Sequence, residues 1–152
     1  LTGLCSAMYF NEKGEEIPNP DPNSGLYIRS RTGATVKAVI PSDCLAFQMG
    51  DTQQIHSCGA LQATPHCVMA GKVPHVSRET FAVFMEPEMG EPMNVPTDSD
   101  PAIITGGTTA YLPKGVPPLA ARWKPTYDFG TFTNATLNAY HPDAKEVDLE
   151  VK

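Results

Sequence analysis

Residues 77–87 read Ser-Arg-Glu-Thr-Phe-Ala-Val-Phe-Met-Glu-Pro. Aromatic, β-branched and other apolar side chains dominate this stretch and a proline ends it, which is typical of a β-strand. Because alternate residues of a strand share a face, the even-numbered residues from Arg78 to Phe84 are expected to point to one side. We therefore predict a strand over Glu79–Glu86, paired with a second strand over His66–Ala70.

The residues before this stretch carry further strand signals, separated by turn residues. The chain has 15 prolines and 12 glycines, and short β-type runs lie between them. Asn11–Ser24 contains three prolines, which remove backbone donors, so this segment is predicted to be a loop. The predicted strands are Leu1–Phe10, a hairpin of Gly25–Ser30 and Ala34–Ile40 around Arg31-Thr32-Gly33, and Asp43–Met49, which ends at a Gly50-Asp51 turn.

The pattern changes after residue 87. Glu88–Pro118 is rich in Pro, Gly and Thr with little periodicity, which predicts an extended surface segment or a lid. Thr131–His141 is predicted to be a helix, because Phe132, Ala135 and Ala139 fall on one face and a proline follows. The fold class predicted is thus an all-β core over residues 1–87. A C-terminal extension over residues 88–152 carries a loop and a short helix that pack on that core. Trp123 is expected to attach this extension to the core.

Composition excludes several classes of protein. The 152 residues are 41% hydrophobic and 18% charged, as expected for a globular chain with its own core. With 11 basic and 17 acidic residues the formal net charge is −6 and no basic cluster occurs, so no nucleic-acid partner is expected. No apolar run approaches the roughly 18 residues of a membrane span. The four cysteines, without a Cys-x-x-Cys pair, are predicted to be free thiols of a cytoplasmic protein.

Three residues form a candidate binding site within this β-core. His66 opens one predicted strand and Arg78 precedes another, so both can reach one cavity together with Thr80. A guanidinium offers two parallel donors that match a carboxylate, and a threonine hydroxyl adds a third hydrogen bond. A neutral imidazole beside them is a plausible metal ligand. The residues alone thus favour a site for a metal and a dicarboxylic acid, although a single histidine or arginine in a strand is more often structural.

The order of these motifs resembles the C-terminal part of the isopenicillin N synthase-like family of iron(II)- and 2-oxoglutarate-dependent oxygenases. Members carry Leu-Thr shortly after a His-x-Asp, then a Gly-Asp turn, His-x-Val and Arg-x-Ser. Here Leu1-Thr2, Gly50-Asp51, His66-Cys67-Val68 and Arg78-Glu79-Thr80 occur in that order. The resemblance covers residues 1–87, and the ordered series carries it rather than any single motif.

The resemblance implies a double-stranded β-helix, or jelly roll, which this chain contains without its N-terminal part. It also implies Fe(II) bound by two histidines and one carboxylate, with open positions for the co-substrate 2-oxoglutarate and for O2. His66 would be the distal iron ligand, and Arg78 and Thr80 would bind the far carboxylate of 2-oxoglutarate. The activity implied is oxidation of a small organic molecule that the sequence does not identify.

The chain departs from the family pattern in ways that matter for activity. The first His and the Asp of the iron site are expected upstream of Leu1. Cys67 stands where the family often has Arg, and Thr80 replaces Ser but keeps the hydroxyl. Because one imidazole does not hold iron usefully, the chain alone is expected to be inactive. The missing N-terminal half, or a second copy pairing edge to edge, is expected to complete the sheets.

Two alternatives use the same residues differently. In the first, the chain is an iron-free, degenerate β-helix that binds a small carboxylate through Arg78. In the second, it is an interaction domain in which His66 and Arg78 have no ligand. A His-x-Asp encoded just before Leu1 would favour the oxygenase over both.

Other residues are weaker candidates for the site. Asp51, His56 and His75 are available as substitute iron ligands, although an Asp in a turn is expected to support its own backbone. His141 ends the predicted helix, where the helix dipole favours a cation, and is expected to be structural. The candidates for lining a substrate pocket are Met8, Tyr9, Tyr27 and Phe84.

Overall fold

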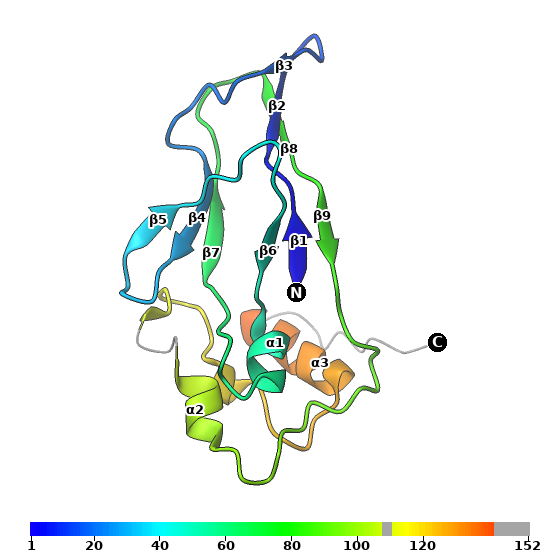
Figure 1. Cartoon of the computed structure of the whole chain (residues 1–152). Coiled ribbons are helices and arrows are strands. Elements are labelled where there is room, and N and C mark those ends of the chain that lie inside the picture. Colours follow the sequence, from blue (N-terminus) through cyan, green and yellow to red (C-terminus); the bar gives the residue numbers. More distant parts are fainter. Residues whose placement is uncertain (108–110, 142–152) are drawn as a thin grey trace. The chain divides into compact units, whose positions relative to one another are not determined.

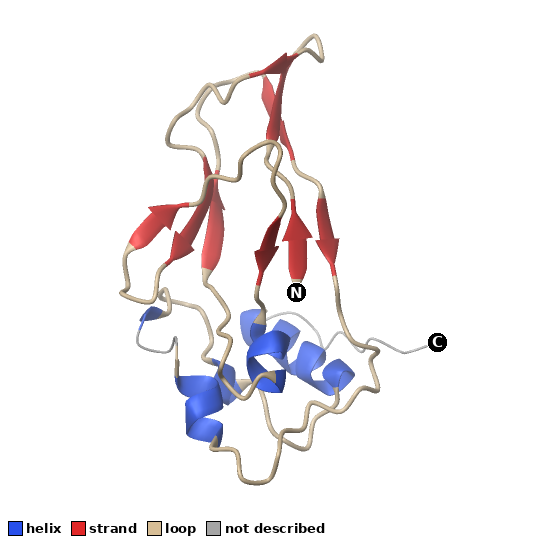
Figure 2. Cartoon of the chain, viewed as in Figure 1, coloured by secondary structure: helices blue, strands red, loops and turns tan. Residues whose placement is uncertain are grey.

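A computed structural model describes residues 1–107 and 111–141 of the chain. It divides into two compact units, the first made of Leu1–Gln48 and Thr64–Met85 and the second of Met49–Ala63 and Glu86–Lys152. The strands of the described residues belong to the first unit and the helices to the second (Figures 1 and 2). The second unit therefore includes residues 49–63, which the sequence prediction placed in the β-core. Residues 142–152 of the predicted extension lie outside the described residues.

Two long segments of the first unit, residues 2–11 and 76–84, run antiparallel to each other. Strand β1 (Thr2–Leu4) pairs with β9 (Ala82–Phe84), and β2 (Met8–Asn11) pairs with β8 (Val76–Glu79), both antiparallel (Figure 1). Between the pairs Leu4–Ala82 and Met8–Glu79, residues 5–7 on one side face residues 80–81 on the other. This extra residue interrupts the pairing as a β-bulge does, and the two pairs of strands belong to different sheets. The single strand predicted over Leu1–Phe10 is therefore two strands.

The predicted hairpin is confirmed as β4 (Gly25–Arg29) and β5 (Thr35–Lys37). Strand β7 (His66–Met69) pairs with β4, so the predicted pairing of His66–Ala70 with Glu79–Glu86 is wrong. The reason is that the β8–β9 segment is paired with β2 and β1 instead. Strand β6 (Ala46–Gln48) pairs with β1. Strand β3 (Glu16–Ile17) pairs with β2 inside the predicted loop, before the first of its prolines.

The first unit thus consists of three small antiparallel sheets, each with three strands. Their orders are β6-β1-β9, β3-β2-β8 and β5-β4-β7. The mostly-β character predicted from the sequence is confirmed for this unit. Strands β6 and β9 lie at the edges of their sheet, and each has β1 as its one partner in that sheet.

The second unit is built from short helices and connecting segments. Helix α1 (Asp51–His56) occupies the predicted Gly50-Asp51 turn, where Gly50 is the N-cap. Helix α2 (Pro101–Gly106) lies inside the segment predicted to be extended, with Asp100 as N-cap and Pro101 in the first turn. A 3-10 turn, η2, covers Leu119–Ala121. The predicted C-terminal helix is confirmed as α3 (Phe129–Tyr140). No helix within the described residues has both the length and the apolar character needed to cross a membrane.

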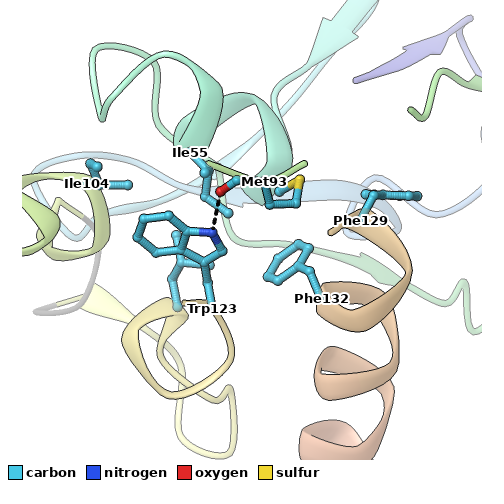
Figure 3. Close-up of a cluster of buried hydrophobic side chains, with 7 residues drawn as sticks. Ile55, Met93, Ile104, Trp123, Phe129 and Phe132 are labelled. Atoms are coloured by element: carbon cyan, nitrogen blue, oxygen red, sulfur yellow. Dashed lines mark hydrogen bonds between the residues drawn. The ribbon is translucent and has the colours of Figure 1, made fainter. Parts of the chain in front are cut away.

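The core of buried hydrophobic side chains lies in the second unit (Figure 3). The indole Nε1 of Trp123 donates a hydrogen bond of 2.9 Å to the carbonyl of Met93 at its centre. Trp123 therefore packs in the core of its own unit, which corrects the prediction that it pins the extension onto the β-core. The buried hydrophobic residues are Ile55, Met93, Ile104, Leu119, Trp123, Phe129 and Phe132.

Asp128 caps α3, and its ionisation is expected to make the stability of the second unit depend on pH. Its carboxylate accepts a hydrogen bond of 2.7 Å from the backbone N–H of Thr131. The Thr131 side chain, and then its backbone N–H, hold the pKa of Asp128 below the ordinary value of 3.8. The folded state therefore favours the ionised carboxylate. Its contribution to stability is present above pH 3.8 and is lost as the pH falls through the lower folded pKa.

Thermal melts between about pH 5 and about pH 3 test this linkage. Trp123 is the only tryptophan of the chain, so its fluorescence follows the second unit. Asp128→Asn keeps an oxygen for the cap but does not titrate, and is expected to lose less stability on acidification than the wild type. Asp128→Ala is expected to be less stable at every pH. Equal pH dependence of the wild type and Asp128→Asn would contradict the assignment.

Candidate functional site

The first unit contains a cavity of about 480 Å³, within the range of small-molecule sites. Its lining residues come from all three sheets and from the bulge at residues 5–7. The alternate residues Arg78, Thr80, Ala82 and Phe84 all line it, as the strand period predicts. The expected inward face of residues 77–87 is therefore present even though its predicted partner strand is not.

Arg78 has an unsatisfied donor at this cavity. It lies on β8 directly opposite Tyr9 of β2, and both side chains line the cavity. The Arg78 side chain is half-buried, and its Nε is buried without a hydrogen-bond partner. Among the described residues no carboxylate lies within ion-pair distance of its guanidinium. A buried donor without an acceptor is costly, so an acceptor on a ligand would stabilise this side chain.

The charges around the cavity favour an anion. Lys37 and Arg78 are among its lining residues, which include no Asp or Glu. This contrasts with the chain as a whole, whose formal net charge is −6. A cavity with fixed positive charge and partly apolar walls strengthens the attraction for an anion, because the walls reduce screening by water.

His66 reaches the cavity from β7, which is paired with β4 rather than with the Arg78 strand. Its Nδ1 lies 3.1 Å from the carbonyl oxygen of Thr64. The amide nitrogen of Gln48 lies 2.8 Å from Nδ1 and 3.1 Å from Nε2. Both ring nitrogens are therefore engaged within the chain. An Nδ1–H bonded to a backbone carbonyl is a common arrangement for a histidine that binds metal through Nε2, but Gln48 would have to move to free that lone pair.

The residues considered as substitute iron ligands, Asp51, His56 and His75, do not line the cavity with His66. Asp51 is the first residue of α1, and its carboxylate forms an ion pair of 2.8 Å with Arg122 in the second unit. His56 is exposed at the end of the same helix, and His75 pairs with Glu12 at 2.5 Å on the surface. Among the described residues no three His, Cys, Asp or Glu side chains are grouped so that they could hold a metal ion. The described residues therefore do not fit an iron centre by themselves. His141 is exposed at the end of α3, where it is the C-cap.

The remaining candidates divide into two groups. Tyr9 and Phe84 line the cavity, whereas Met8 and Tyr27 are not among its lining residues. The hydroxyl of Tyr27 instead donates a hydrogen bond of 2.8 Å to the carbonyl of Asn23.

The sequence interpretation missed Lys37 and Gln48, which both line the cavity. Lys37 is the only charged residue of the predicted strand Ala34–Ile40. A single charge in an otherwise uncharged strand could have indicated a residue of the cavity. Gln48 had no comparable signal, because its role depends on its distance from His66.

The cavity therefore brings together His66, Arg78 and Thr80, the three residues singled out from the sequence. Among the described residues it contains no group of three side chains that could hold a metal ion. Any assignment of function depends on the chemistry of these residues and on the order of the sequence motifs. No known protein family, curated protein or solved structure matches the chain.

Proposed function

We propose that this chain is the C-terminal part of an iron(II)- and 2-oxoglutarate-dependent oxygenase of the isopenicillin N synthase-like kind. In this proposal the cavity of the first unit binds 2-oxoglutarate beside a small organic substrate. Arg78 and Thr80 bind the far carboxylate of the co-substrate, and His66 is one ligand of the iron. The observation that carries the proposal is the buried, unpartnered Nε of Arg78 at a cavity without acidic residues.

The geometry of the carboxylate site supports this role. Arg78 and Thr80 are alternate residues that line the same cavity. A guanidinium and a hydroxyl on one face can together give a carboxylate three charge-assisted or neutral hydrogen bonds. The side chains of β9 that continue this face, Ala82 and Phe84, are apolar and also line the cavity.

The jelly-roll fold is part of the same proposal. It is supported by the antiparallel pairing of every sheet in the first unit and by the cavity that these sheets line. The edge strands β6 and β9 leave backbone groups available to further strands. We propose that an additional N-terminal segment, or a second copy, supplies them. A cytoplasmic location is also proposed, since all four cysteines are free thiols.

Iron, when bound, would supply the activation of O2 that an oxygenase requires. The described residues do not complete its site, so no step of the reaction is assigned to them beyond binding and positioning. Their contribution is to hold the co-substrate through Arg78 and Thr80 and to orient His66 through the Thr64 carbonyl. Two further ligands would have to come from outside the described residues.

The second candidate function is an iron-free module that binds a small carboxylate. The observation that favours it is the engagement of both ring nitrogens of His66 by Gln48 and Thr64. A histidine held in this way serves as a hydrogen-bonding group of the cavity rather than as a metal ligand. Both functions share the anion site at Arg78, and they differ in the requirement for metal.

Binding of 2-oxoglutarate to the metal-free chain tests the shared site. Arg78→Met is expected to weaken binding by about 2–3 kcal/mol, or roughly 30- to 150-fold, because a charge-assisted contact is left unmade. Thr80→Val is expected to cost less, about 0.5–1.5 kcal/mol, since one neutral donor is lost. The measurement is isothermal titration calorimetry, with 2-oxobutyrate, which lacks the far carboxylate, as the control ligand.

Arg29→Met is the matched control variant. Arg29 is also a half-buried strand arginine of the first unit, but its guanidinium donates to the Gly33 carbonyl and it does not line the cavity. This variant should bind 2-oxoglutarate like the wild type, and equal binding by Arg78→Met would contradict the proposal. With Fe(II) and ascorbate, the chain alone is expected not to release succinate. Robust release that is lost in His66→Ala would show that the other ligands lie within this chain.

A further inference from the structure

A row of apolar side chains crosses the cavity face of the sheet β5-β4-β7. Leu26 of β4 lies directly opposite Val68 of β7. Ala38 follows β5, and its backbone N–H donates a hydrogen bond of 2.8 Å to the carbonyl of Leu26 from the other side. These residues all line the cavity. Because residues that lie opposite each other on neighbouring strands point to the same face of a sheet, the row presents one continuous apolar surface to the cavity.

His66 lies in the next row of the same face. It precedes Val68 by two residues on β7 and lies opposite Ile28, so its ring and the Val68 side chain emerge on one side of the strand. Gln48, which contacts the His66 ring at 2.8 Å, shares the cavity face of its own sheet with Phe84. Val68 is 52% exposed and Phe84 is 71% exposed. The cavity therefore leaves apolar surface near His66 in contact with water.

The polar groups near this row already have partners within the chain. The Ser24 hydroxyl lies 3.0 Å from the side-chain oxygen of Asn19, and both residues line the cavity. Lys37 lies on the opposite face of the sheet, and its Nζ donates a hydrogen bond of 2.6 Å to the carbonyl of Pro22. The buried Nε of Arg78, which has no partner among the described residues, belongs to a different sheet. A charged group placed against the apolar row would thus lose its water without gaining a partner.

We infer that the primary substrate places an uncharged hydrocarbon group beside His66, and that the row of Ala38, Leu26 and Val68 determines this specificity. Contact with the row removes apolar surface of both molecules from water, which stabilises the complex. The inference rests on the proposed function, in which 2-oxoglutarate occupies Arg78 and His66 is an iron ligand. It adds the chemical class of the part of the substrate that lies near His66, which the carboxylate site does not define.

Phenylnaphthylamine, an uncharged apolar probe whose fluorescence rises when it leaves water, tests the row. It is titrated onto the whole chain in the presence of saturating 2-oxoglutarate. Val68→Thr keeps a β-branched side chain of similar shape but adds a hydroxyl that an apolar ligand cannot satisfy. This change is expected to weaken probe binding about fivefold or more. Anilinonaphthalene sulfonate, the same skeleton with an anionic group, is expected to bind more weakly than the neutral probe, because the row carries no charge.

Other exposed strand valines provide matched controls. Val36 on β5 is 45% exposed and Val83 on β9 is 47% exposed, and neither lines the cavity. Val36→Thr and Val83→Thr should each change probe binding by less than about twofold. Val68→Ile stays apolar and should retain binding, which separates the added hydroxyl from a general effect of changing this position.

Several results overturn the inference. These are unchanged probe binding in Val68→Thr, a loss shared by Val68→Thr and Val68→Ile, and an equal or larger loss in either control variant. Tighter binding of the sulfonate probe than of the neutral probe, or no saturable binding of the neutral probe to the wild type, overturns it as well. Failure of the proposed function appears separately, as 2-oxoglutarate binding that is absent or independent of Arg78.

Discussion

Replacing Asp51 by alanine is expected to lower the free energy of unfolding of the second unit by about 3–5 kcal/mol. The change removes the carboxylate that lies 2.8 Å from the guanidinium of Arg122. The Arg122 side chain is 4% exposed, whereas that of Asp51 is 30% exposed. Removing the carboxylate therefore leaves a buried cation without its counter-charge, which is the costly way to break such a pair.

The other contacts of Arg122 do not replace the carboxylate. Its Nε donates to the Pro117 carbonyl and its Nη1 to the hydroxyl of Thr136, each at 3.2 Å. Its guanidinium carbon also lies 6.0 Å from the ring centroid of Phe132 and 5.8 Å from that of Tyr140. These partners are neutral, so they orient the guanidinium but compensate its charge only weakly.

A double-mutant cycle makes this prediction sharper. Arg122→Met keeps an apolar side chain of similar length, and its cost is expected to be smaller because Asp51 can be hydrated. The double variant should be less destabilised than Asp51→Ala alone, since no buried charge remains. Urea unfolding followed by Trp123 fluorescence measures each variant. Lys124→Met is the control, because Lys124 is exposed and its ammonium lies over the ring of Tyr127, and it should change stability by less than about 0.5 kcal/mol. Additive costs of Asp51→Ala and Arg122→Met would contradict the assignment.

The parts of the fold that follow from local periodicity could be predicted from the sequence. The period of two in residues 77–87 correctly placed Arg78 and Thr80 at one cavity. The single strand predicted over Glu79–Glu86 is wrong, because the segment forms β8 and β9 with Thr80 and Phe81 between them. The hairpin around Gly33 was equally local, and Gly33 has a φ of +81° in the turn. Helix α3 carries both a cap at Asp128 and a buried apolar position at Phe132, which are signals within one segment.

Features that depend on distant segments could not be predicted in this way. The partner of the His66 strand is β4, some 40 residues earlier, and nothing in the His66 segment specifies that pairing. The bulge at residues 5–7 contains no glycine or proline to indicate it. Helix α1 has six residues, too few for a helical period or for stability alone. Its buried Gln54 is held by the Ile104 carbonyl at 2.6 Å and the Ala63 N–H at 2.8 Å.

The candidate site shows the same division. Motif order located His66, Arg78 and Thr80, but it did not indicate that Gln48 contacts the His66 ring. Lys37 was overlooked because its relevance comes from the cavity, which three sheets create together. A residue type and its spacing therefore locate chemistry along the chain, whereas the residues that tune the site require the tertiary structure.

The chain by itself is expected to self-associate through the sheet β6-β1-β9. One face of this sheet, with Thr2, Gln48 and Phe84, lines the cavity. On the opposite face Phe47 and Val83 lie on either side of Gly3, which has no side chain that could cover them. Its apolar residues are exposed to a degree that usually marks an interface or an aggregation site. Their exposed fractions are Leu45 56%, Phe47 56%, Phe81 65%, Val83 47% and Met85 41%.

Light scattering on the 152-residue chain is expected to give a weight-average mass above that of the monomer, rising with protein concentration. Phe47→Lys and Val83→Lys place charges on the apolar face and should shift the chain towards the monomer. Val36→Lys is the matched control, because Val36 is 45% exposed but lies on β5 in another sheet. A monomer that melts cooperatively and is unaffected by Phe47→Lys and Val83→Lys would mean that the first unit needs no further strands. In that case an interaction domain would describe the chain better than part of an oxygenase, because the proposed jelly roll requires further strands to cover this face and these edges.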